Sequence, residues 1–241
     1  MSAQSRSEVI AHPPLAARRG AARATTWWGK AWVRAVEESA YADDELRAAR
    51  ALARQGAVGG ISLGRGRLVA AVADSRGLWS VAVALPTVDS EAGEALVEVV
   101  AAEAGRIGAL LAGDLPHTLV EHADEAGVEL LPFGGELECS CSCDAWVDPC
   151  PHALAVLYQA AWLLDRSPLL LLHLRGLPRE ELLARLHALT TRAVAPTSLP
   201  TSAPSEDNQV DADVDVALDA ADRAAQLLSR LDAGGSIDHL L

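Results

Sequence analysis

The chain has 241 residues, 50% of them hydrophobic, which is enough to bury the core of one domain and leave tails. Its formal net charge of −13 argues against a dedicated nucleic-acid binder, because such proteins need clustered Lys and Arg to neutralise phosphates. No stretch approaches the roughly 20 apolar residues of a membrane helix, and residues 1–23 lack the apolar centre of a signal peptide. We therefore expect a cytoplasmic protein with reduced thiols and no membrane partner.

The charge is distributed unevenly along the chain. Residues 1–85 contain twelve Lys and Arg against seven Asp and Glu, a balance of +5, whereas residues 86–241 contain eight against twenty-six, a balance of −18. The N-terminal part could therefore meet an acidic partner, while the rest would repel one.

The N-terminal segment, residues 1–24, has a Pro13-Pro14 pair, several arginines and no apolar period, and is predicted to be a disordered, mildly basic tail. Thr26 can cap a helix that runs to about Tyr41, and a second helix is expected over residues 43–55. Three strands are expected at 61–63, 68–73 and 78–85, joined by glycine-containing turns into an antiparallel meander. With helical segments at 89–112 and 116–126, residues 25–127 are predicted to form an α+β domain.

The second half is predicted to contain a small zinc module, residues 128–190, of the strand–loop–helix type. Short strands at 128–131 and 136–141 are expected to be joined by the turn at 132–135, and Pro151 is a suitable first residue for a helix that reaches Leu164. A leucine-rich helix at 168–174 and a helix from Pro178 follow. Residues 191–211 are predicted to be a linker, and residues 212–241 a flexible arm with an acidic amphipathic helix.

All four cysteines lie between positions 139 and 150, and Cys141, Cys143, Cys150 and His152 form a C-x-C-x6-C-x-H array. Three thiolates and one imidazole are ligands that Zn²⁺ takes at tetrahedral corners. Cys139 complicates the assignment, because residues two apart on a strand share a face and the pairs 139/141 and 141/143 compete. Four protein ligands leave no open position for activating water, so a structural zinc site is expected.

Two other uses of the cysteines fit less well. A disulfide scaffold requires an oxidising compartment, and an iron–sulfur cluster is usually held by four cysteines rather than by a tight C-x-H. The sequence also lacks the motifs of serine hydrolases, zinc proteases and nucleotide-binding loops, so the protein is predicted not to be an enzyme. A calcium loop at Asp211–Asp222 is excluded because its sixth and twelfth positions hold Val216 and Asp222.

The array and its surroundings resemble the SWIM-type zinc finger of bacterial proteins, whose pattern is C-x-C, a variable gap and C-x-H. The similarity extends over about residues 25–190 and includes Thr26–Trp32 and Asp165–Leu172. It implies Zn²⁺ bound by Cys141, Cys143, Cys150 and His152, with Cys139 packing as a small hydrophobic residue. Two positions depart from the family: Asp144 stands where Pro is common, and Pro151 where Lys is common. The lost lysine weakens the case for phosphate contact by the finger.

The resemblance also implies a function. Bacterial members of the family are thought to act beside helicase-like ATPases, so a protein-interaction adaptor in a DNA-linked process is one hypothesis. Direct nucleic-acid binding through the N-terminal basic half is the other.

Several smaller groups of residues have both a structural and a functional interpretation. Trp28 and Trp32 are one helical turn apart and are expected to pack in the core, with Trp27, rather than stack on bases. The turn Gly64–Arg67 is interpreted mainly as a basic hairpin tip, and Trp146 as a lid on the zinc site. The histidines without ligand partners are expected at the surface or at helix caps: His117, His122, His173 and His187.

Overall fold

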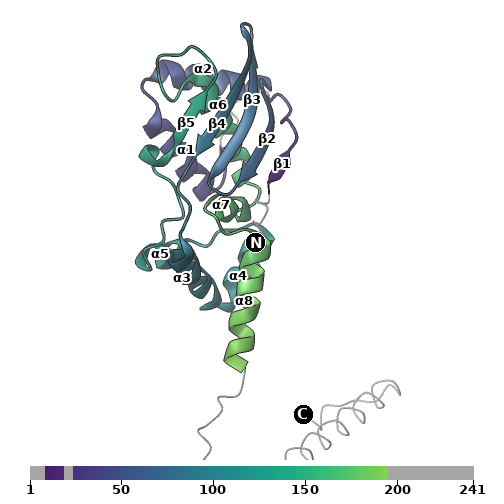
Figure 1. The fold of residues 1–241 in the computed structure, drawn as a ribbon, viewed down its shortest axis with the longest axis vertical. Coiled ribbons are helices and arrows are strands. Elements are labelled where there is room, and N and C mark those ends of the chain that lie inside the picture. Colours follow the sequence, from purple (N-terminus) through teal and green to yellow (C-terminus); the bar gives the residue numbers. More distant parts are fainter. Residues whose placement is uncertain (1–8, 19–23, 195–241) are drawn as a thin grey trace, which may run out of the picture. The chain divides into compact units, whose positions relative to one another are not determined.

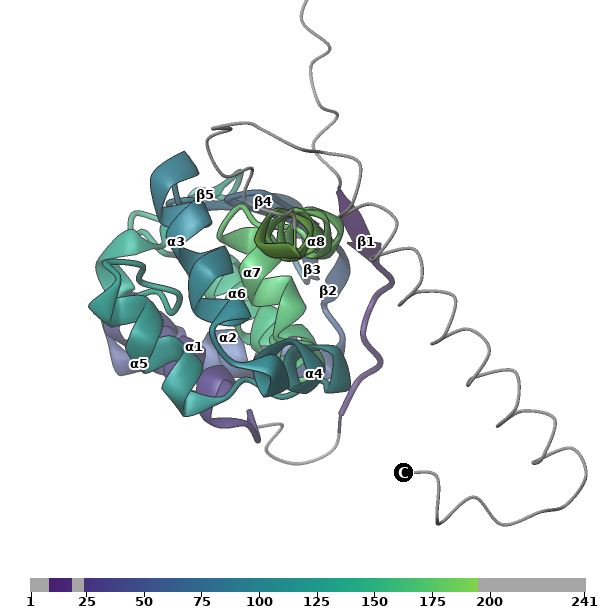
Figure 2. The same ribbon diagram turned by 90° about the horizontal axis from the view of Figure 1, so that it is seen from below.

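The computed structural model describes residues 9–18 and 24–194. Figures 1 and 2 show the described helices and strands, and all of these strands belong to a single sheet. In chain order they are β1 (Ile10–His12), α1 (Trp27–Ser39), α2 (Asp43–Gln55), β2 (Val58–Gly64), β3 (Arg67–Asp74), β4 (Gly77–Ala84), α3 (Ser90–Ala101), α4 (Ala104–Ala112), α5 (His117–Glu125), a 3-10 turn (Gly134–Glu136), β5 (Glu138–Cys141), α6 (Pro151–Leu164), α7 (Leu169–Leu174) and α8 (Arg179–Val194).

The sheet is antiparallel throughout, with strand order β1-β2-β3-β4-β5. Alternate side chains on one face, such as Leu68 opposite Val83, are buried, as the period of two residues in a strand requires. The predicted meander is thus confirmed as β2–β4 and is extended by one strand on each side. The α+β class is also confirmed.

Helix α6 lies at the centre of the core. Every residue from His152 to Leu164 is buried, which is the pattern of a helix enclosed on all sides. Helices α1 and α2 pack on α6, which also contacts strands of the sheet (Figure 1). The indole N–H groups of Trp28 and Trp32 donate hydrogen bonds of 3.0 Å to carbonyl oxygens of α6, at Leu164 and Leu157. The prediction that these two tryptophans pack in the core is confirmed.

The prediction of a disordered tail is wrong for residues 10–12. This segment pairs with β2, with Ile10 opposite Leu63 and His12 opposite Ile61. The pairing is carried by backbone groups, since a strand at the edge of a sheet offers unpaired N–H and C=O groups to any extended segment. Such pairing does not require alternating apolar residues, so the sequence gives no sign of it. Residues 1–8 and 19–23, the other parts of the predicted tail, lie outside the described residues.

The prediction of a strand at residues 128–131 is also wrong. Val128 and Leu130 are buried, but the amide of Val128 donates to Ala123 at the end of α5 instead of joining a ladder. Strand β5 pairs with β4 across about 57 positions of sequence, so no hairpin forms through residues 132–135. Gly134 permits a close approach to α1 there, since a Cβ would lie 2.8 Å from the Cβ of Glu38.

Two boundaries differ from the predictions. The expected helix over 89–112 is divided into α3 and α4, and α8 continues to Val194, so the first four residues of the predicted linker are helical. The remainder of that linker and the predicted C-terminal helix lie outside the described residues.

The described residues of the predicted parts 25–127 and 128–190 share one sheet and one core. In the part of the chain that the structure describes, no helix has both the length and the apolar character needed to cross a bilayer.

Candidate metal centre

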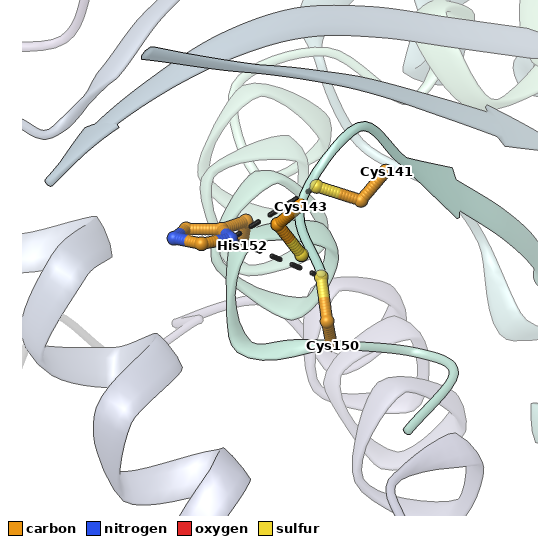
Figure 3. A group of neighbouring side chains, drawn as sticks. All are labelled: Cys141, Cys143, Cys150 and His152. Atoms are coloured by element: carbon orange, nitrogen blue, oxygen red, sulfur yellow. Dashed lines mark hydrogen bonds between the residues drawn. The ribbon is translucent and has the colours of Figure 1, made fainter. Parts of the chain in front are cut away.

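Four side chains of the cysteine-rich segment converge where β5 ends and α6 begins (Figure 3). Cys141 is the last residue of β5 and lies opposite Val81, which places it on the buried face of the sheet. Cys143 follows in the connecting loop, which is anchored by hydrogen bonds of 3.0 and 2.9 Å between Ser142 and Ser80. Cys150 is the N-cap of α6, and His152 lies in the first turn behind Pro151. The predicted strand end and helix start are therefore adjacent.

The size of this cluster suits a tetrahedral metal ion. The four ligand atoms lie within 4.8 Å of one another. The Nδ1 atom of His152 is 3.9 Å from the sulfur of Cys141 and 4.0 Å from that of Cys150. Tetrahedral zinc with Zn–S bonds of about 2.3 Å places its sulfur ligands roughly 3.8 Å apart, so small adjustments of these side chains would close the shell. A cluster of three cysteines and one histidine can thus hold a metal ion, consistent with Zn²⁺.

The imidazole of His152 is oriented by a carboxylate at the end of β3. Its Nε2 atom lies 3.2 Å from Oδ2 of Asp74, while Nδ1 is turned toward the cysteines (Figure 3). If a metal were bound to Nδ1, Nε2 would carry the proton and donate a hydrogen bond to the Asp74 carboxylate, which is the usual arrangement behind a metal-bound histidine. The ring of Trp79 stacks on His152 at 5.8 Å between centroids, covering one face of the imidazole.

Asp74 is itself fixed by several donors. Its Oδ1 atom accepts hydrogen bonds from the amides of Arg76 and Gly77, at 2.8 and 3.1 Å, and from the indole of Trp79 at 3.0 Å. The bond from Trp79, aided by those from Arg76 and His152 and opposed by partial burial, holds the pKa of Asp74 well below its usual range. The carboxylate thus stays ionised and is a permanent acceptor for His152.

Cys139 lies outside the cluster. This residue lies on β5, opposite Val83 of β4, and packs against the hydrophobic core. Burial, with smaller contributions from Asp148 and Cys150, raises the pKa of the Cys139 thiol to about 12, so it stays protonated. The geometry therefore brings together the pair 141/143 and not the pair 139/141.

The three clustered thiols differ in their readiness to ionise. Burial opposes ionisation of Cys143, but donation from the Ala145 amide and from neighbouring side chains outweighs it and lowers its pKa to about 7. Burial raises the pKa of Cys141 to about 12 and also raises that of Cys150. A cation bound among these sulfurs would favour their thiolate forms, since metal binding releases thiol protons.

Two predictions about single residues are wrong, and two residues beside the cluster were not predicted. Trp146 is not a lid, because it is 82% exposed and its ring meets the edge of Tyr41 instead of the cluster. His173 is buried within the last turn of α7, neither at the surface nor at the cap position, whereas His117, His122 and His187 are exposed as predicted. Asp74 and Trp79 were not foreseen, because they lie about 60 to 75 residues before the clustered cysteines, in an ordinary hairpin.

The comparisons with known proteins agree with this geometry. Residues 125–161 match the family model of the SWIM zinc finger. The chain is 30% identical over 177 residues to the protein "Uncharacterized protein Rv2102" of Mycobacterium tuberculosis (strain ATCC 25618 / H37Rv). The aligned region is 73% of this chain but spans only 64% of the relative's length. No solved structure matches. The matched residues contain the whole Cys₃His cluster, and this part of the chain belongs to the SWIM zinc finger family.

Proposed function

We propose that the protein is a zinc-binding, non-enzymatic adaptor that joins another protein in a DNA-linked process, with a helicase-like ATPase as the candidate partner. The observation that carries the metal part is the convergence of Cys141, Cys143, Cys150 and His152 at the start of α6. These four residues are the proposed zinc ligands, with Nδ1 as the ligand atom of His152.

The surroundings of the cluster support a structural role for the metal. Cys150 and His152 are each 3% exposed, and four protein ligands complete a tetrahedral shell. A catalytic zinc site instead keeps one position open for water or substrate. Because α6 is the central helix of the core, zinc here would tie the edge strand β5 to the centre of the fold.

The negative charge of one cleft supports a protein partner with a basic surface. A cleft of about 740 Å³ lies in the acidic part of the chain, between the end of β4, the α3 and α5 region and the segment before β5. Among the described residues that line the cleft, Arg175 is the one cation, and it is already paired with Glu136 at 3.1 Å. The carboxylates of Asp89, Asp124 and Glu129 are left to set the charge of the cleft. Burial and the nearby Glu129 raise the pKa of Asp124, so a cation brought by a partner would be favoured there.

If the protein is an adaptor, its protein partner should remain bound to it after nucleic acid is removed. The tagged full-length protein, used on extract of the native organism, is expected to retain a partner after nuclease treatment. Asp124→Asn combined with Glu129→Gln should reduce the amount captured, because these are two of the three lining carboxylates that form no ion pair with another described residue. Glu91→Gln with Glu94→Gln, exposed on α3, removes the same charge and serves as the control. Loss of every captured protein on nuclease treatment would contradict the adaptor function.

A second candidate function is direct nucleic-acid binding by the N-terminal part, favoured by its surplus of cations. The hairpin arginine Arg65 is a poor contact for this purpose. Its guanidinium donates to the carbonyl of Gly176 at 3.0 Å and is paired with Glu181. A surface that binds nucleic acid would therefore be formed by other cations of residues 1–85.

A further inference from the structure

A groove of about 570 Å³ lies between α1, α2 and α6, away from the cysteine cluster. Helices α1 and α2 both pack on α6 and lie beside it in both views (Figures 1 and 2). The groove lining includes Tyr158 and Trp162, one turn apart on α6, which are 6% and 4% exposed. Two largely buried aromatic rings of the core helix thus form an apolar part of the lining.

Cations line this groove in two rows. Lys30 and Arg34 are four residues apart on α1, and Arg50 and Arg54 are four residues apart on α2. Residues at this spacing lie on the same side of a helix, about one turn apart, so each helix offers a pair of positive charges. Glu37 is the one carboxylate among the described residues that line the groove.

The cations differ in whether they are already paired. Arg50 is held by Glu37 at 2.5 Å and by the hydroxyl of Tyr158 at 3.0 Å. Arg34 and Glu38 form a pair at 3.3 Å whose members are both exposed, and such a pair contributes little. Lys30 and Arg54 are exposed and have no carboxylate within ion-pair distance in residues 9–18 and 24–194. They are therefore available to an anion brought from outside.

A fifth cation lies beside the groove. The guanidinium of Arg18 is 4.6 Å from the centre of the Trp162 ring, and its amide donates to the carbonyl of Arg54 at 2.8 Å. Five of the twelve cations in residues 1–85 are thus gathered at one place, on a chain whose net charge is −13. Such local concentration produces a positive potential that the overall charge conceals.

We propose that this groove binds the phosphate backbone of a nucleic acid, an inference that rests on the second candidate function. Two facing rows of cations suit a chain of regularly spaced negative charges better than a small ligand with one anionic group. Because Tyr158 and Trp162 are largely buried, they offer no platform on which bases could stack. Binding is through phosphates and independent of sequence, and an acidic protein segment is the competing occupant that the test must separate.

The test uses the full-length zinc-loaded protein and fluorescent oligonucleotides of about 20 nucleotides, single-stranded and duplex, followed by anisotropy. Wild-type protein is expected to bind at about 50 mM salt and to lose affinity steeply toward about 200 mM. Lys30→Ala with Arg54→Ala should weaken binding at least about tenfold and reduce the salt slope by about 2, since two phosphate contacts are lost. The control, Arg179→Ala with Arg192→Ala on α8, makes the same charge change at exposed positions outside the groove.

Each result of this test either supports or contradicts phosphate binding in the groove. Loss in the groove variant with retention in the control, at unchanged zinc content, supports the inference. Equal binding by the groove variant and wild type overturns it while leaving nucleic-acid binding to another surface. Absence of binding by wild type at about 50 mM salt overturns both this inference and the second candidate function, and leaves the adaptor unaffected. Binding of a polyglutamate peptide in place of the oligonucleotides would assign the groove to an acidic protein.

Discussion

Cys150→Ser is expected to abolish stoichiometric zinc binding. Protein purified without added zinc should contain about one equivalent of zinc per chain, because four protein ligands fill a tetrahedral shell. Cys150 lies at the N-cap of α6, where its sulfur is 4.0 Å from Nδ1 of His152, and a serine hydroxyl is a poor substitute for a thiolate. Elemental analysis of the purified variant should therefore show zinc close to zero.

Cys139→Ser is the matched control for this loss. It makes the same chemical change eleven positions earlier, at a thiol that packs on the core and lies outside the cluster. Its zinc content should equal that of wild type. Equal loss in Cys139→Ser, together with retention in Cys143→Ser, would show that the ligands are the pair 139/141.

Asp74→Asn is expected to weaken zinc binding by about 10–100-fold, the usual effect of removing a partner behind a metal-bound histidine. The substitution acts mainly on one oxygen of the carboxylate, because only Oδ2 faces His152, although Arg76 donates to both oxygens, from its amide to Oδ1 and from its guanidinium to Oδ2. Oδ1 accepts from the turn amides and from Trp79, and an asparagine oxygen can keep these bonds. Oδ2 faces Nε2 of His152, where an amide nitrogen cannot accept the imidazole proton. Competition with a zinc-binding dye at neutral pH measures the change.

Arg76→Ala is the control for Asp74→Asn. Arg76 donates to Asp74 from an exposed position and does not hydrogen-bond to His152. Its removal should leave zinc affinity within about a factor of 2–3, as for other exposed ion pairs. A wild-type affinity in Asp74→Asn would mean that His152 is oriented by α6 and the Trp79 ring alone.

Much of the fold could be predicted from local sequence signals. Thr26 caps α1 by accepting from the amide of Gly29 at 3.0 Å, and Pro151 opens α6, as their residue types indicate. The alternating strands β2–β4 and their glycine turns were also recognisable. The pairing of β1 with β2 was not predictable in this way, because it depends on a free sheet edge meeting a segment that is about fifty residues away.

The same distinction applies to the metal centre. The four clustered ligands lie within twelve residues, so their spacing and chemistry predict the cluster directly. Asp74 and Trp79 reach His152 only because β4 pairs with β5 and brings the β3–β4 turn to the start of α6. Trp146 shows the converse: it is close to the cysteines in sequence, yet its ring contacts Tyr41 and takes no part in covering the cluster.

X-ray absorption at the zinc edge of the native protein tests the central claim most directly. Coordination by Cys141, Cys143, Cys150 and His152 predicts three sulfur atoms at about 2.3 Å and one nitrogen at about 2.0–2.1 Å, with no further ligand. A shell of four sulfur atoms would place Cys139 on the metal in place of His152, and a shell with a water oxygen would indicate an open site. Either result would contradict a closed structural zinc centre built from these four residues.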